Sequence, residues 1–376
     1  MNPRRIMAAL AAVAILGAAD ARAGDLLVLD SSDPAHVPGT IVAGDGAMAV
    51  AAGAVVTLLA EDGSITRLDG PYQGAAPGAA ASEGNLVSSL ATMMGEGDVD
   101  TQAFGAVRGG DDGPAGIWTI DLSGSGSRCV DGAGPDGLWR GTVASGRFRD
   151  LASGTNVALA WSQPASTVPW PDGIAVVNGA EYAFVPDGGA GLAHIVIHKL
   201  PKVLPTAAHL LRWLGEQDCG AQARALLARI VEPPAALTLA LDSVHGATPV
   251  LAVGEALGIR LATNRDAHVR CLYQQVDGVV VTLFPNRFTG GPRVAGFATH
   301  AIPSASDGFS LTMGGPPGTE RVLCFAWSTD PSARLPAEVN DADITRPFGA
   351  PLETVLGWID AAEPEARATL AIEVRE

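Results

Sequence analysis

Lysine is almost absent from this sequence, which contains only Lys199 and Lys202 among 376 residues. Lys and Arg together number 24 against 40 Asp and Glu, so the formal net charge is −16. A surface this acidic repels phosphate backbones, and no stripe of basic residues offsets it. Nucleic acid and anionic membrane surfaces are therefore expected to be poor partners. Lysine is rare and Ala, Gly, Arg and Asp are abundant, which is the bias of proteins encoded by G+C-rich bacterial genomes. The scarcity of lysine is therefore not a sign of a binding function.

Long hydrophobic runs are also lacking. The longest apolar stretch, Ala47–Ala60, is interrupted by Gly53 and is shorter than the roughly 20 residues of a membrane-spanning helix. We interpret it as two strands, and we expect no transmembrane segment after the leader.

Residues 1–23 have the pattern of a secretory signal peptide: two adjacent arginines, a short apolar segment, and small residues ending at Ala23. An uncleaved anchor is the alternative, but the apolar segment is too short to cross a bilayer. Cleavage would leave 21 basic and 39 acidic residues, a formal charge of −18, because three arginines and Asp20 lie in the leader. The sequence thus predicts a periplasmic or secreted bacterial protein, with the Sec and twin-arginine routes both open.

Cysteine is scarce, and no CxxC pair occurs, which argues against a redox motif and against a zinc ribbon. The four cysteines all follow the leader, and an even number in an exported chain favours disulfides. Three pairings are possible. We predict Cys271–Cys324 and Cys129–Cys219, because Cys271 and Cys324 are expected on neighbouring strands of one domain.

Nucleophile-elbow, kinase and P-loop motifs are absent. Gly132–Gly137 satisfies G-x-G-x-x-G, but Pro135 removes one backbone N–H and no amphipathic helix follows, so we interpret it as a turn. A dispersed catalytic triad stays possible, because a triad is recognised by geometry. We predict no catalytic, cofactor-binding or metal-ligating residues from the sequence, and no cofactor.

His194 and His198 have the i, i+4 spacing of a helical zinc site. The β-branched residues between them predict a strand, on which the two Cα atoms would lie about 13 Å apart, too far for one metal. Aspartates also gather in Gly-rich loops, where calcium is the natural ion, but the EF-hand spacing is absent and we favour a solvated surface. They are Asp98, Asp100, Asp111, Asp112, Asp131 and Asp136.

The chain is predicted to be mainly β and multidomain. After the leader (1–23), short strands and turns in 24–73 indicate a small all-β domain, with Asp62-Gly63 as a hairpin turn. Residues 74–112 are predicted to be a linker with one possible short helix near Asn85–Met94. A Trp-rich β region, 113–232, ends in a helical hairpin over Thr206–Ile230 that Pro233-Pro234 terminates.

Residues 236–376 have the strand spacing of a β-sandwich, followed by a helix over Pro351–Ala362 and a final strand over Thr369–Val374. The tail from Asp330 to Arg346 is either packed on this domain or loose. The tryptophans of the middle region are expected to form one buried core.

The last region resembles domain of unknown function 4384 over roughly residues 240–330. The matching motifs occur in the expected order: Gly254–Leu257, Cys271–Tyr273, Leu283–Asn286, Ile302–Pro303 and Gly315–Glu320. The resemblance implies an exported or envelope-facing bacterial protein, and the family has no established catalytic residues to transfer. Residues 25–72 are similar to the extracytoplasmic β-domain of ferric-citrate-type anti-sigma regulators, through Gly53, Asp62–Ser64 and Leu68–Tyr72, but the chain lacks the transmembrane helix of such regulators.

These observations favour a non-enzymatic interaction or scaffolding module of the cell envelope, with an envelope or periplasmic protein as its partner. One alternative is an envelope hydrolase with a dispersed site in the Trp-rich region. Another is a carbohydrate-binding module, if the rings of several tryptophans are exposed for stacking on sugars. Those tryptophans are Trp118, Trp139, Trp161 and Trp170.

Overall fold

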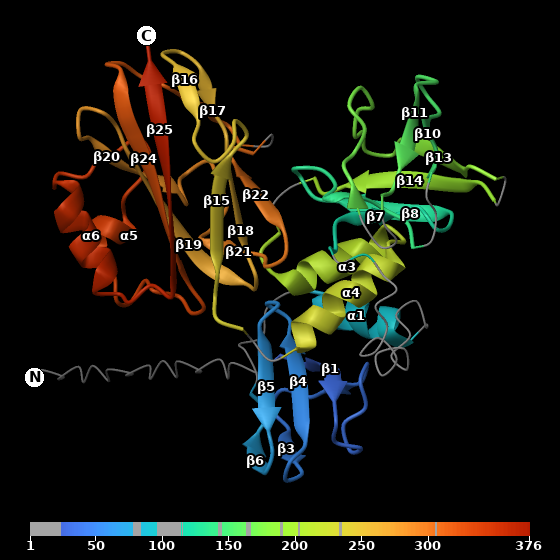
Figure 1. Ribbon diagram of the computed structural model, residues 1–376. Coiled ribbons are helices and arrows are strands. Elements are labelled where there is room, and N and C mark those ends of the chain that lie inside the picture. The colour runs from blue at the N-terminus through green and yellow to red at the C-terminus, as the bar shows by residue number, and fades with distance from the viewer. Residues whose placement is uncertain are drawn as a thin grey trace, which may run out of the picture.

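The computed structural model describes residues 24–77, 84–95, 114, 116–141, 145–162, 167–188, 191–201, 204–232, 235–304 and 307–376. The predicted signal peptide, most of the predicted linker and Pro233-Pro234 lie outside these residues. The described chain is mainly β and consists of several small sheets around a few helices, as the sequence predicts (Figure 1).

The N-terminal unit is a four-stranded antiparallel sheet of order β2-β1-β4-β5 with a separate β3–β6 hairpin. Val28, Val56 and Leu58 point to one face, and Leu27 and Leu59 point to the other. Both faces are buried, which explains why these strands have continuous apolar runs. The predicted Asp62-Gly63 turn connects β4 to β5, and β6 runs two residues into the predicted linker. The bounds are β1 Leu26–Ser31, β2 Ile41–Val42, β3 Ala47–Val50, β4 Val55–Ala60, β5 Ile65–Asp69 and β6 Tyr72–Ala75.

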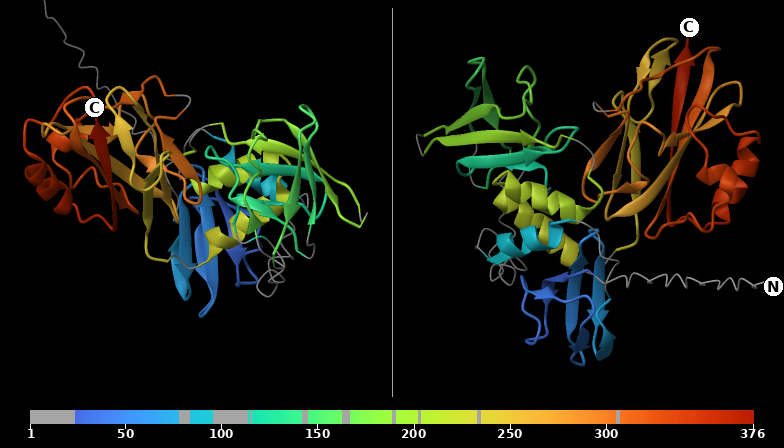
Figure 2. Two further views of the ribbon diagram at one scale, coloured as in Figure 1. Left: turned by 45° about the horizontal axis from the view of Figure 1, so that its top comes forward. Right: turned by 180° about the vertical axis from the view of Figure 1, so that it is seen from behind.

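Three helices form a layer in the middle of the molecule: α1 Leu86–Gly95, α3 Ala207–Glu216 and α4 Gly220–Val231. The helical hairpin predicted from the period of apolar residues is confirmed, and Thr206 caps α3 by accepting a hydrogen bond from the His209 N–H. The helix α1 lies within the predicted linker, but its apolar side chains are buried in this layer. Figure 2 shows the helices between the N-terminal sheet and the Trp-rich sheets.

The Trp-rich region contains a five-stranded sheet of order β11-β10-β13-β14-β8 and a three-stranded sheet of order β12-β9-β7. Aliphatic and aromatic side chains from both sheets form one core, which includes Phe148, Phe184 and Ile195. The bounds are β7 Thr119–Asp121, β8 Gly126–Val130, β9 Gly137–Trp139, β10 Ser145–Asp150, β11 Asn156–Ala160, β12 Thr167–Val168, β13 Glu181–Pro186 and β14 Ala193–Lys199.

The expectation that the tryptophans of this region share one core is wrong. Trp161 and Trp170 lie between the two sheets, whereas Trp118 and Trp213 pack in the helical layer. Trp118 belongs to a different core because it lies at the end of the region that rests on α4. The carbonyl of its neighbour Ile117 accepts a hydrogen bond from the α4 side chain Gln222.

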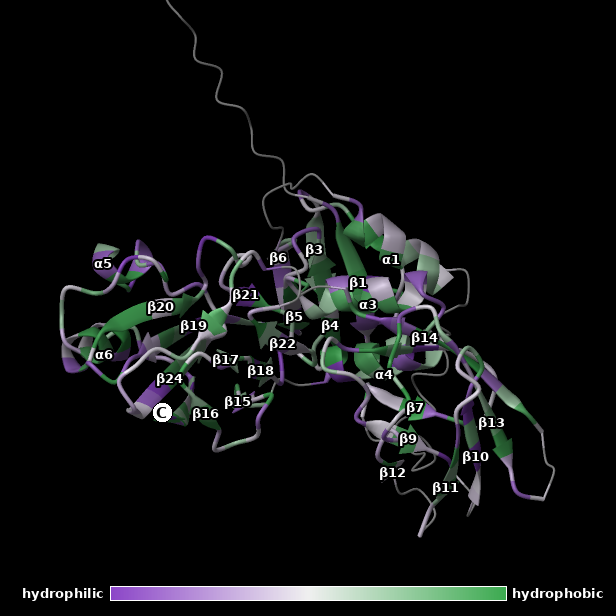
Figure 3. Cartoon of the chain, turned by 90° about the horizontal axis from the view of Figure 1, so that it is seen from above, coloured by the Kyte–Doolittle hydropathy of each residue, from purple (hydrophilic) through white to green (hydrophobic). Residues whose placement is uncertain are grey.

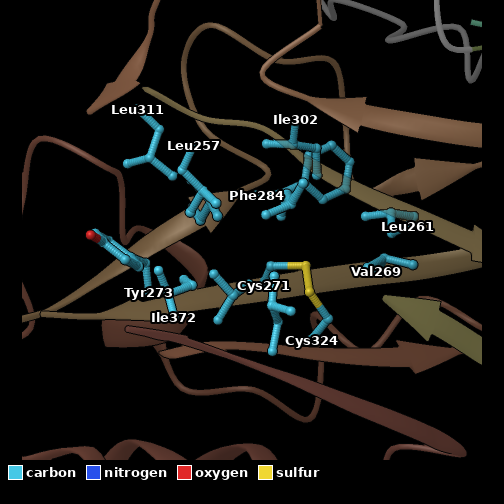
Figure 4. Packing of buried hydrophobic residues seen from close by; sticks show 14 of the residues in the cluster. Leu257, Leu261, Val269, Cys271, Tyr273, Phe284, Ile302, Leu311, Cys324 and Ile372 are labelled. Atoms are coloured by element: carbon cyan, nitrogen blue, oxygen red, sulfur yellow. A yellow bond between two sulfur atoms is a disulfide. The ribbon is translucent and has the colours of Figure 1, made fainter. Parts of the chain in front are cut away.

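The C-terminal region is the predicted sandwich. A sheet of order β15-β18-β22 faces a sheet of order β16-β25-β24-β19-β20, in which β21 also pairs with β19. Their shared core includes Leu261, Val269, Ile302 and Ile372 (Figure 4). The bounds are β15 Leu239–Ser243, β16 Val250–Ala252, β17 Ala256–Leu257, β18 Ile259–Thr263, β19 Ala267–Gln274, β20 Val280–Phe284, β21 Arg293–Val294, β22 Thr299–Ile302, β23 Leu311–Thr312, β24 Gly318–Trp327 and β25 Ala366–Arg375.

The second face of the larger sheet is covered by two helices, α5 Ala337–Asn340 and α6 Leu352–Asp360. Leu335 and Val339 are buried there beside Trp327, so the segment from Asp330 to Arg346 is packed on the sandwich and is not loose. Because both faces of the sheet are covered, side chains on both faces of β19 and β20 are buried. Every residue of β20 is buried, and this strand is green in the hydropathy colouring of Figure 3.

Both predicted disulfides are present. Cys271 and Cys324 are directly opposite each other on β19 and β24, inside the sandwich core. Cys129 and Cys219 join β8 to the turn between α3 and α4. In the part of the chain that the structure describes, no helix is long and apolar enough to span a membrane.

Candidate functional site

The N-terminal sheet, the helical layer and the sandwich meet at residues 293–298 of the sandwich, which comprise β21 and the loop after it and are called the 293–298 loop below. Arg293 Nη1 donates to the backbone oxygen of Asp62 at 3.1 Å. The Ala295 N–H donates to the Leu204 carbonyl at 3.2 Å, and the Trp118 indole N–H donates to the Phe297 carbonyl at 2.7 Å. The loop therefore contacts three separate parts of the chain.

Two residues of this loop have restricted backbones. Phe297 has φ +66°, a left-handed conformation that is rare for a bulky residue. A Cβ on Gly296 would collide with backbone atoms of Arg265 and Asp266, so only glycine fits there. These features hold the loop against the 264–266 segment and place Phe297 in the apolar cluster of the helical layer.

Asp266 connects the sandwich to the start of α3. Its Oδ1 accepts hydrogen bonds from the Ala207 N–H at 2.7 Å and from the Gly296 N–H at 2.8 Å. Burial raises the pKa of this carboxyl to about 6, although the two N–H donors and the nearby Arg293 guanidinium act in the opposite direction. Asp266 thus satisfies a backbone donor at a helix N-terminus from a different unit.

The β4–β5 turn completes the junction. Gly63 has φ +79°, and a Cβ there would collide with the Thr206 side chain that caps α3. The Glu61 carboxylate accepts hydrogen bonds from the first two N–H groups of α1, those of Leu86 and Val87. One short turn therefore contacts α1, α3 and, through Arg293, the sandwich.

A cavity of about 590 Å³ lies at this junction. Its walls come from β4 and β5, from the end of α4, and from the loops of the sandwich. A volume of this size at a meeting of several units is typical of a binding site. The lining residues with polar or charged side chains are Thr57, Ser64, Arg67, Arg229, Glu232, Asn264, Arg265, Asp266, Arg293 and Ser328.

Arginine is the commonest residue in the lining, and three of the four arginines have described ion pairs with carboxylates outside the cavity. Arg67 Nε lies 3.3 Å from Asp69 Oδ1, and Arg265 Nη2 lies 3.0 Å from Glu365 Oε2. Arg293 Nη1 lies 3.9 Å from Asp62 Oδ2. The rest of the wall includes apolar side chains, namely Ile65, Ile230, Val231 and Phe297.

The two serines of the lining are not arranged as nucleophiles. Ser64 Oγ donates to Asp62 Oδ1 at 2.6 Å, and Ser328 Oγ donates to Glu365 Oε2 at 2.7 Å. No histidine lines this cavity among the described residues, so neither hydroxyl has the imidazole base of a Ser-His triad there. The arrangement can bind and orient a ligand.

The histidines at 194 and 198 lie on β14, as the sequence predicts. His194 Nε2 is 3.1 Å from Glu181 Oε2, and His198 Nε2 is 3.3 Å from Ser127 Oγ. These are two separate pairs, and they share no residue. An acid, an imidazole and a serine are therefore present in this sheet but do not combine into one triad.

The glycine-rich hexapeptide is a turn between β8 and β9. Asp131 Oδ1 accepts hydrogen bonds from the Ala133 and Gly134 N–H groups, which stabilises the turn. Burial raises the pKa of Asp131, against the effect of a hydrogen bond from Thr299. Asp136 lies in the same turn, and the other four aspartates of the predicted acidic loops lie outside the described residues.

Three of the four tryptophans considered for sugar stacking are buried: Trp118, Trp139 and Trp161. Trp170 is half-buried, its ring meets Phe148 and Tyr182 edge to face, and its indole N–H donates to the Ile174 carbonyl. A carbohydrate-binding module needs exposed ring faces, so this geometry argues against that alternative.

The junction cavity was not predicted from the sequence. Its arginines are separated by up to 226 positions along the chain, between Arg67 and Arg293, and no local motif links them. The only local signals were the turn at Asp62-Gly63 and the end of the helical hairpin. Neither signal indicates which distant loop packs against it.

The fold and site define a mainly β, disulfide-bonded protein of several units with a ligand-sized cavity at their junction. Residues 250–331 match the model of the family described as domain of unknown function DUF4384, and this range extends from β16 to β24 of the sandwich. The expected C-terminal resemblance is therefore confirmed for this part of the chain. No curated protein matches the sequence.

Two solved structures share low similarity with the chain. One contains the N-terminal four Ig domains of Dscam1 isoform 8.4, with 9% identity over 93% of this chain and a TM-score of 0.16. The chain covers 66% of that structure, slightly less than two thirds. The other contains the titin domains z1z2 in complex with telethonin, with 9% identity over 66% of this chain and 90% of that one, and a TM-score of 0.13. These scores are too low to support an inference about fold or function.

Proposed function

We propose that this protein is an exported, non-enzymatic interaction module of the bacterial envelope, and that the junction cavity is its binding site. The single observation that carries the proposal is the position of the cavity. Three units of the chain form its walls, and the loop at 293–298 bonds all three together. A rigid, concave site of this kind is preformed for binding.

Two further features support export and a binding role. Both disulfides join cysteines that are distant in sequence, as expected for a protein that folds in an oxidising compartment. The leader-like residues 1–23 would direct the chain to the periplasm or the exterior. The partner is proposed to be an envelope or periplasmic protein. For residues 25–72 we propose only that they share the domain type of the extracytoplasmic β-domain of anti-sigma regulators, and we propose no signalling role.

Site-specific photo-crosslinking in the bacterial host tests the proposal. A benzoylphenylalanine at Ala235, on the exposed rim of the cavity, should capture one dominant envelope protein. The same residue at Arg321, on the exposed surface of the sandwich, is the control and should not capture it. An identical adduct from both positions, or none from Ala235, would overturn the proposal.

A cavity-filling variant sharpens this test. Ile230→Trp adds volume to the wall at the end of α4, whereas Ile230→Leu keeps the volume nearly unchanged. We expect the adduct from position 235 to disappear with tryptophan and to persist with leucine. Persistence in both variants would show that the partner does not use the cavity.

A further inference from the structure

The lining of the cavity has more guanidinium groups than carboxylates, although the protein as a whole is strongly acidic. Its lining has four guanidinium groups, from Arg67, Arg229, Arg265 and Arg293, and two carboxylates, from Glu232 and Asp266. The whole chain has 16 more acidic than basic charges, so this local excess of arginine is opposite in sign to the rest of the molecule. Guanidinium groups in a concave, partly apolar wall attract an anion more strongly than the same groups would on an open surface.

Three of the guanidinium groups retain capacity for a ligand. The hydrogen bonds and ion pairs described for Arg67, Arg265 and Arg293 each use one nitrogen of the group. A guanidinium has five N–H donors in a planar fork that matches carboxylate and phosphate oxygens. The side chains of these three arginines are between 29% and 33% exposed, so they are anchored without being enclosed.

Neither carboxylate of the lining forms an ion pair with Arg67, Arg265 or Arg293 in the described part of the chain. Asp266 already accepts two backbone N–H groups at the back of the junction. Glu232 lies at the exposed C-terminal cap of α4. The lining thus combines four arginines with the apolar side chains of Ile65, Ile230, Val231 and Phe297.

We propose that the cavity binds an organic anion, in which a carboxylate or phosphate group meets the arginines and an apolar body contacts the aliphatic and aromatic wall. This inference rests on the proposed function in one respect, namely that the cavity is a binding site. It adds the chemical group that the cavity recognises. An acidic side chain or C-terminus of the protein partner carries this group, and so does a small anionic molecule, which serves as the probe below.

Paired fluorescent probes test the class of ligand on the full mature chain. 8-Anilinonaphthalene-1-sulfonate is an amphiphilic anion, and N-phenyl-1-naphthylamine is its uncharged counterpart. We expect the sulfonate to bind more tightly and to be displaced by octanoate, by octyl phosphate or by both. The more effective competitor identifies carboxylate or phosphate as the preferred group. Raising the salt concentration should weaken binding of the sulfonate more than binding of the neutral probe.

Matched variants locate the site. Arg67→Gln should weaken binding of the sulfonate about ten-fold, the effect of losing one charge-assisted hydrogen-bonding group, and leave the neutral probe unchanged. Arg321→Gln removes the same charge from the outer surface of the sandwich and should leave the affinity for both probes unchanged. Melting curves of both variants establish that they are folded.

The outcomes separate the two proposals. If both probes bind with equal affinity, Arg67→Gln has no effect, and Ile230→Trp abolishes binding, the cavity is a binding site but not for anions. Failure of the sulfonate to bind, or equal weakening by Arg67→Gln and Arg321→Gln, would likewise overturn the anion proposal. If Ile230→Trp leaves binding of both probes unchanged, the probes bind elsewhere and the anion proposal fails, whereas the proposed function is decided separately by the crosslinking from position 235.

Discussion

Asp266 shows how one side chain can make the joint between two units sensitive to pH. Its carboxylate caps the first helical residue of α3 and the loop residue Gly296, and burial raises its pKa from 3.8 to about 6. Between pH 3.8 and about 6, the carboxyl of Asp266 is therefore protonated in the folded protein but ionised in the unfolded chain. The charged groups near it include Arg293, which moderates the shift.

The sign of the effect follows from linkage. Between about pH 4 and pH 6 the folded state binds more protons at Asp266, so the contribution of this residue to the free energy of unfolding decreases as the pH rises and is constant above that range. The change should be about 1 to 3 kcal/mol, since part of Asp266 is accessible to solvent. Asp266→Asn should flatten the pH dependence of the free energy of unfolding, measured from urea unfolding curves at several pH values. Asp266→Ala should in addition lose the hydrogen bonds to the two N–H groups. An unchanged slope in the asparagine variant would contradict the assignment.

Gly63 offers a second prediction at the scale of a single residue. Gly63→Ala adds a left-handed backbone penalty and a collision with Thr206, so it should lower the free energy of unfolding by about 2 to 3 kcal/mol. Gly53→Ala is the control, because Gly53 has nearly the same φ, +77°, but no atom within 4 Å of the added Cβ. Equal destabilisation of the two variants in thermal melts would show that the contact with Thr206 is unimportant.

At the scale of elements, the helix α4 joins the Trp-rich sheet through one glutamine. The buried Gln222 accepts the Cys129 N–H at 2.7 Å and donates to the carbonyls of Ile117 and Cys129 at 2.6 and 2.7 Å. It thus satisfies backbone groups of β8 at the edge where the parallel β14–β8 pair ends. A buried edge without such partners would be costly.

Gln222→Ala should lower the free energy of unfolding by about 2 to 4 kcal/mol, because three buried backbone groups lose their partners. Gln217→Ala, in the turn before α4, is the control and should change it by less than about 1 kcal/mol. Urea unfolding followed by tryptophan fluorescence measures both. A small effect of the first substitution would mean that water can replace the amide.

Most elements could be predicted from the sequence because they depend on local signals. Alternating or continuous apolar residues between Gly, Pro and Asp turns identified the longer strands, and the period of the apolar residues identified α3 and α4. Short strands such as β16 and β22 were not predicted, because a segment of two to four residues shows too little periodicity to identify a strand. Trp118 was assigned to the wrong core, because its strand pattern does not reveal that the helical layer lies beside it.

At the scale of the whole molecule, a single apolar cluster connects parts of all the units. Leu27 comes from the N-terminal sheet, Leu90 from α1, Leu226 from α4, Cys129 from the Trp-rich sheet, and Ala298 from the sandwich. The disulfide between Cys129 and Cys219 closes a separation of 90 residues within this cluster. It connects the Trp-rich sheet covalently to the helical layer.

Replacing both members of this disulfide with alanine should lower the free energy of unfolding by about 3 to 4 kcal/mol, because the unfolded chain regains the entropy of a long loop. The Cys271→Ala, Cys324→Ala pair is the comparison, since that disulfide closes a separation of 53 residues and should cost slightly less. Chemical denaturation under oxidising conditions gives both values. No loss of stability in the first variant would contradict this role for the cross-link.

The sequence by itself determined the β-rich class, the acidic surface, the helical hairpin and the disulfide partners. Each of these depends on composition, on local periodicity, or on which strands are neighbours within one domain. Only the tertiary structure decided that Arg67, Arg229, Arg265 and Arg293 line one cavity, and that Asp266 caps a helix of another unit. The physical reason is that such contacts join residues far apart in the chain, and their geometry depends on how complete units pack together, which no short segment encodes.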